Sequence, residues 1–156
     1  MIKLSFLSCL VLLISIMSMG QQRDKAQEPP RKANKIIVMV KDTANALLNR
    51  LSGILFDKGY TIEAKDEQAK YIITKGQPSK SYGTISKIRA RINDTAIIFT
   101  SQLAVDSERD IFGVKRRELD YMDVDYSGAK KSAFREAWNE LDAIAHMFGD
   151  KIVYSK

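Results

Sequence analysis

The chain has 156 residues, with 25 Lys and Arg, 19 Asp and Glu, one His and one Cys. This length predicts one domain, and a composition of 45% hydrophobic and 28% charged residues excludes a fibrous or disordered chain. A single His excludes a metal site built from several histidines. The net charge of +6 is compatible with a polyanionic partner, so its distribution along the chain decides what it means.

The first twenty residues are typical of a secretory signal. Lys3 supplies a positive start, residues 4–17 form a short apolar run, and Ser18 and Gly20 are small residues placed for cleavage after Gly20. We therefore predict that residues 1–20 are a signal peptide and that the chain is exported, to the periplasm, the outer membrane or the exterior. The alternative is an uncleaved leader, through which the chain would be held at the membrane.

Residues 21–34 show no periodic apolar pattern and contain Pro29-Pro30, which predicts a flexible linker. Leader and linker carry half of the net charge, so residues 35–156 keep a net charge of +3. This is an ordinary surface charge, and we expect no nucleic-acid partner. Because Cys9 lies in the leader, the mature chain would have no disulfide, no thiolate metal site and no cysteine nucleophile.

The first part of the mature chain predicts a strand, a helix and two more strands. An uninterrupted apolar run at 35–40 predicts a buried strand. Asp42 is placed to cap a helix whose apolar residues recur every three or four positions, and Gly59 is placed to end it. Short apolar segments predict the further strands at 60–64 and 71–74.

The second part predicts a hairpin, a further strand, a helix and a last strand. Residues 84–93 alternate between apolar and basic side chains, and 95–105 continue the alternation after a turn, so the two form an antiparallel hairpin. A less regular strand is predicted at 114–126. The most regular helical stripe of apolar residues runs over 134–148, and residues 152–154 predict the final strand.

The predicted order of elements is βαβββββαβ, with no internal repeat. This order indicates an α+β fold, in which one mixed, largely antiparallel sheet carries two amphipathic helices on one face. We expect residues 35–156 to form a single domain of this kind. The last helix is expected to end at Gly149.

The stretch from Leu47 to Gly76 holds a helix ending in DKGYTI and a strand reading QAKYIITKG. In this it resembles the opening of small bacterial envelope domains of the TolB N-terminal and CsgG-like type. The hairpin ARINDTAIIFTSQL is similar to their meander. The resemblance covers about half of the mature domain, rests on structural motifs and carries no catalytic residue. It implies a periplasmic or outer-membrane-associated accessory domain, although this chain lacks the lipobox cysteine of many such lipoproteins.

The alternating segment places Lys87, Arg89 and Arg91 on one face of a strand. Such a basic face could bind an acidic polymer, for example an acidic glycan or lipopolysaccharide. The alternative is that the charges protect an exposed sheet from aggregation. Single-stranded nucleic acid is not expected here, because Tyr82 is the one aromatic residue nearby that could stack on a base.

Residues 123–128 match the first half of a calcium-binding loop, with Asp123, Asp125 and Ser127 as candidate ligands. The twelfth position of the loop, where calcium sites need a bidentate glutamate, is Phe134, which also belongs to the predicted helix stripe. The alternative is that the aspartates lie on the solvent side of a strand and that Ser127 caps the last helix.

Three functional hypotheses follow. The first is an exported, non-enzymatic domain that binds a protein or glycan of the cell envelope, because folding accounts for every strong pattern. The second is binding of an acidic polymer by the basic strand face. The third is a calcium-assisted hydrolase that uses the acidic segment 118–125. His146, one turn after Asp142, is interpreted as a surface residue, as are Glu136 and Glu140 of the same helix.

Overall fold

The computed structural model describes residues 28–79, 81–93, 95–105, 119–127, 129–149 and 151–156, so the predicted signal peptide lies outside the described residues. The described elements are, in chain order, β1 (Lys35–Met39), α2 (Ala44–Asp57), β2 (Ile62–Asp66), β3 (Tyr71–Thr74), β4 (Gln77–Pro78), β5 (Thr84–Ile92), β6 (Ala96–Val105), β7 (Met122–Asp123), α3 (Ala133–His146) and β8 (Ile152–Ser155). The predicted α+β fold is therefore confirmed. The two-residue strand β4 had no predicted counterpart.

The strands form one sheet in the order β2-β3-β5-β6-β1-β8, with β4 paired to β5 and β7 paired to β6. All strand pairs among the described residues are antiparallel. The predicted hairpin is the central and longest pair, running from Thr84 opposite Val105 to Ile92 opposite Ile97. At its turn, the Asn93 side chain accepts hydrogen bonds from the backbone N–H groups of Thr95 and Ala96.

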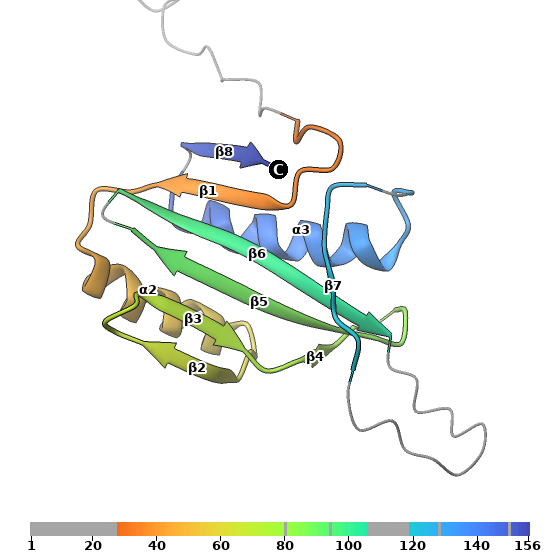
Figure 1. The fold of residues 1–156 in the computed structure, drawn as a ribbon, viewed down its shortest axis with the longest axis horizontal. Coiled ribbons are helices and arrows are strands. Elements are labelled where there is room, and N and C mark those ends of the chain that lie inside the picture. Colours follow the sequence, from red (N-terminus) through yellow and green to blue (C-terminus); the bar gives the residue numbers. More distant parts are fainter. Residues whose placement is uncertain (1–27, 80, 94, 106–118, 128, 150) are drawn as a thin grey trace, which may run out of the picture.

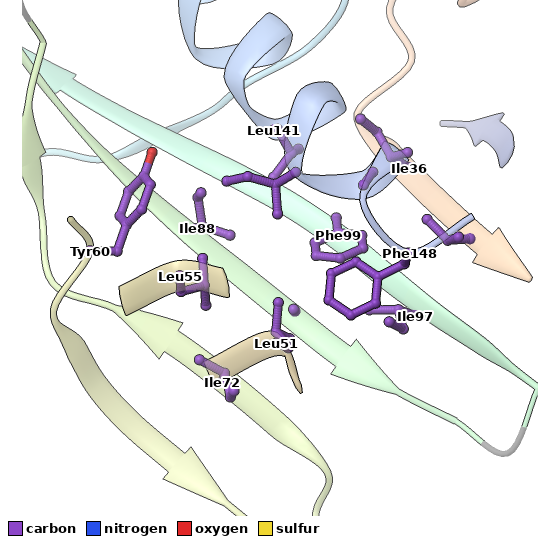
Figure 2. Close-up of a cluster of buried hydrophobic side chains, with 14 of the residues drawn as sticks. Ile36, Leu51, Leu55, Tyr60, Ile72, Ile88, Ile97, Phe99, Leu141 and Phe148 are labelled. Atoms are coloured by element: carbon purple, nitrogen blue, oxygen red, sulfur yellow. The ribbon is translucent and has the colours of Figure 1, made fainter. Parts of the chain in front are cut away.

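Both helices lie on the same side of the sheet, and the core fills the space between (Figure 1). Helix α3 packs on β1, β5 and β6, and α2 packs on β2, β3 and β5. Strand β5 shows why the helices cover this face of the sheet. Its apolar residues Ile88, Ala90 and Ile92 are buried under the helices, while the basic residues between them point to the opposite face. Figure 2 shows the centre of this core, where side chains from both helices meet those of the strands.

The two helix starts differ from the predicted ones. Thr43, not Asp42, caps α2, with its hydroxyl accepting from the Ala46 N–H at 3.4 Å. Ser132, not Ser127, caps α3, so the interpretation of Ser127 as a helix cap was wrong. The reason is spacing, because an N-cap hydroxyl must lie next to the first helical residue, here Ala133, to reach the free N–H groups.

The two helix ends differ from each other. Helix α2 ends as predicted at Gly59, whose φ of +85° is the left-handed conformation that glycine adopts most easily. Helix α3 ends at His146, before the predicted Gly149. There the N–H groups of Met147 and Phe148 bond to carbonyls three residues back, which tightens the last turn and brings the Phe148 ring into the core.

The predicted strand at 114–126 is reduced, in its described part, to the two residues of β7. Beyond Val124 the chain leaves β6 and exchanges backbone hydrogen bonds with the end of the predicted linker, from Tyr126 to Ala33 and from Lys32 to Tyr126. Ala33 is fully buried, so this end of the linker is packed against the domain. No helix among the described residues is both long and apolar enough to cross a membrane.

Candidate functional site

The face of the sheet opposite the helices carries a continuous row of side chains. The strand register places these five residues side by side across β3, β5, β6, β1 and β8, in the order Tyr71, Arg91, Ile98, Ile37 and Val153. We call them the outer row. Arg91 and Val153 are exposed and the other three are partly exposed. No described helix covers this face, which is turned toward the viewer in Figure 1.

The three residues of the predicted basic face differ in their surroundings. Lys87 is only 20% exposed, and its ammonium lies 2.8 Å from the Glu63 carboxylate and 4.8 Å from the centre of the Tyr121 ring. The hydrogen bond from Lys87, followed by its charge, lowers the pKa of Glu63. Arg89 and Arg91 are exposed and form no ion pair among the described residues. Thus, of the three predicted basic residues, only Lys87 has an ion pair among the described residues.

The predicted calcium ligands Asp123 and Asp125 have separate hydrogen-bond partners. Asp123 is exposed on β7 and accepts a hydrogen bond from the Gln102 amide at 2.9 Å. Asp125 accepts a hydrogen bond from the Ser127 hydroxyl, and Val124 between the two aspartates is buried. In the described part of the chain, no group of three or more His, Cys, Asp or Glu residues is arranged to hold a metal ion. Calcium binding therefore stays a prediction.

His146 lies at the surface, as its place on the helix predicted. Its Nδ1 is 2.9 Å from the backbone carbonyl of Asp142 and 3.6 Å from the carboxylate of the same residue. That carboxylate also accepts a hydrogen bond from the Tyr154 hydroxyl at 2.9 Å. Partial burial, and then this bond, raise the pKa of Tyr154. The contacts of Asp142 with His146 and Tyr154 connect the end of α3 to β8. They indicate a structural role and no catalytic one.

A pocket of about 300 Å³ lies between the first half of α3 and strands β4 to β6. Its lining combines acidic, polar and small apolar side chains: Gln77, Pro78, Ser79, Ser86, Leu103, Ala133, Glu136, Ala137 and Glu140. Glu136 and Glu140 are neighbours on the surface of α3, as interpreted from the sequence, and both also line this pocket. One turn apart on a helix, they share a face, and small residues beside them leave room for the pocket.

A buried tyrosine, Tyr60, lies next to this pocket and close to Glu140. Two backbone bonds that close α2, from Gly59 to Phe56 and from Tyr60 to Leu55, fix the position of Tyr60. Its side chain is 2% exposed, and its hydroxyl points away from Leu55 in Figure 2. Burial, and then the charge and hydrogen bond of Glu140, raise the pKa of Tyr60 far above its ordinary value.

Two further polar contacts complete the pocket. The Ser86 hydroxyl lies near the Tyr60 hydroxyl and by itself lowers the pKa of Tyr60. The Ser79 hydroxyl donates to Glu136 at 3.0 Å. The Gln77 side-chain oxygen is buried and has no hydrogen-bond partner among the described residues. Sequence reasoning missed the pocket because its walls come from segments about sixty residues apart, and only the pair of glutamates gave any signal.

The geometry defines an α+β domain with one helix-covered and one open sheet face, a surface row of mixed character and a small acidic pocket. Neither the protein-family models nor the curated proteins contain a match to this chain. The resemblance to TolB N-terminal and CsgG-like domains therefore stays a prediction.

Proposed function

We propose that this chain is an exported, non-enzymatic domain of the cell envelope that binds a protein partner through the outer row. The observation that carries the proposal is the row itself. It places one aromatic, one arginine and three aliphatic side chains next to each other on an open sheet face. A folded domain normally covers such a face or uses it for binding.

The chemistry of the row favours a protein over an acidic polymer. The centres of protein interfaces are enriched in aromatic residues and arginine and depleted in lysine and glutamate, which is the composition found here. A polyanion would need several unpaired cations, but Lys87 is already neutralised by Glu63. Arg89 and Arg91 alone, set beside Ile73, Thr100 and Ile98, make a weak polyanion site.

The binding proposal is tested by photo-crosslinking in the source organism. A benzophenone amino acid is placed at Ile98 or Val153 in the outer row, and at Asn139 on the exposed side of α3 as a matched control. We expect a discrete protein adduct from the two row positions and none from position 139. Adding Arg91→Glu should abolish the adduct while the melting temperature of the purified domain stays unchanged.

Two outcomes would overturn this proposal. Equal labelling at positions 98 and 139 would show that the row is not a specific surface. An adduct that carries polysaccharide or lipopolysaccharide instead of protein would favour the acidic-polymer hypothesis.

Export is supported by the pattern of residues 1–20 and is tested separately. N-terminal sequencing of the chain from fractionated cells should find it outside the cytoplasm and starting at Gln21. A cytoplasmic chain that retains Met1 would contradict this part of the proposal and leave the binding test unaffected.

A further inference from the structure

We propose that the pocket beneath α3 binds a small primary amine in its ammonium form. The pocket is a site distinct from the outer row, because it lies on the helix-covered side of the sheet and the row lies on the open side. Two glutamates line it, and the lining residues that the structure describes include no Lys, Arg or His. The field inside the pocket is therefore negative, which attracts a cation and repels an anion.

The described groups of the pocket offer a ligand more hydrogen-bond acceptors than donors. The Ser79 hydroxyl, which lines the pocket, already donates its proton to Glu136. An ionised carboxylate offers about four acceptor sites, so each glutamate keeps most of its capacity after one such bond. The buried oxygen of Gln77 adds an acceptor for which no described residue supplies a donor. A ligand that satisfies these groups must donate several hydrogen bonds, as an ammonium group does.

The pocket also holds the Glu140 carboxylate in place. Glu140 is a solvent-exposed residue of α3, and a free glutamate side chain there would point into water. Here the side chain instead lines the pocket, close enough to the buried Tyr60 hydroxyl to raise the pKa of Tyr60. Such preorganisation lowers the entropy cost of binding a cation.

The apolar lining residues favour an aliphatic chain as the remaining part of the ligand. Pro78, Leu103, Ala133 and Ala137 present apolar atoms that suit a few methylene groups. A volume of about 300 Å³ is at the lower end for small-molecule sites, so a compact aliphatic amine fits better than a large cofactor. These apolar walls suit a metal ion poorly, because calcium and magnesium need oxygen ligands on most sides.

The test is an NMR titration of the purified domain with putrescine, and with butanediol as the neutral analogue of the same length. With putrescine at up to about 10 mM, we expect saturable amide shifts centred on Gln77, Ser86 and Ala137. Butanediol should produce none. Glu140→Gln and Glu136→Gln should each weaken putrescine binding by about tenfold, since each removes one charged partner. Melting curves verify that each variant is folded.

Two matched variants separate this proposal from its alternatives. Glu67→Gln removes a carboxylate that is paired with Lys65 at the surface, so it should leave putrescine binding unchanged. Arg91→Glu should also leave it unchanged, so failure of the outer-row proposal would not affect this one. The inference is overturned if putrescine causes no localised shifts or if butanediol binds equally well. It is equally overturned if Glu67→Gln weakens binding as much as Glu140→Gln does, because general charge attraction would then explain the effect.

Discussion

Tyr60→Phe tests how the buried tyrosine is coupled to Glu140. The substitution keeps the ring in the core but removes the hydroxyl that bonds to the carboxylate. A hydrogen bond to a charged group stabilises a fold by about 1.5 kcal/mol or more, so at pH 8 the variant should unfold more easily by about that amount. In alkali this stability difference should shrink, because the variant has lost an ionisable group that the wild type keeps.

The magnitude follows from the pKa of Tyr60. In the folded state this pKa is raised above the ordinary value of 10.0. The folded chain therefore keeps its proton at a pH where the unfolded chain has lost it. The stabilisation that Tyr60 contributes is complete below pH 10 and falls as the pH rises further. One pH unit above the unfolded pKa, the wild type has lost about 1.4 kcal/mol that the variant cannot lose.

The assay is urea unfolding of both proteins at about pH 8 and pH 11. The stability difference between wild type and Tyr60→Phe should shrink by about 1.4 kcal/mol between the two conditions. Tyr154, whose pKa is also raised, is present in both proteins, and its contribution cancels in the difference. Ile88→Val is the matched control, because it weakens the neighbouring core without removing a proton, and its curve should run parallel to that of the wild type. A difference for Tyr60→Phe that stays constant with pH would refute the raised pKa of Tyr60.

Four further predictions concern stability and are measured by thermal and urea unfolding. Gly53→Ala should raise the unfolding free energy by about 1 kcal/mol, because the position lies inside α2 and an added methyl meets nothing within 4 Å. Gly76→Ala should lower it by about 1–3 kcal/mol, because the methyl would overlap the Ile85 side chain; equal effects at the two glycines would contradict this. Ser132→Ala should cost about 1 kcal/mol through loss of the cap of α3, and no loss would show that the cap is dispensable. Phe99→Ala should cost about 3–5 kcal/mol, since the ring is fully buried, and a cost below that of Ser132→Ala would contradict the packing described.

The order and faces of the elements were largely predictable. The alternation through 84–92 marked which side of the sheet is buried, and the stripe through 134–148 marked the buried side of α3. Both follow from local geometry, because side chains repeat every two residues on a strand and every 3.6 residues on a helix. The ends of elements were less predictable, as Ser132 and His146 show, because several residues near each end could have formed the cap.

The sequence by itself thus determined the α+β class, the elements and the side of β5 on which Lys87, Arg89 and Arg91 lie. The tertiary structure alone decided what each of these residues meets. Glu63 neutralises Lys87 from a strand two positions away in the sheet, and Tyr60 lies near Glu140 from the segment that follows α2. Such contacts depend on strand register and helix packing between distant segments, which local periodicity does not encode. For that reason the outer row and the pocket could be identified only from the tertiary structure.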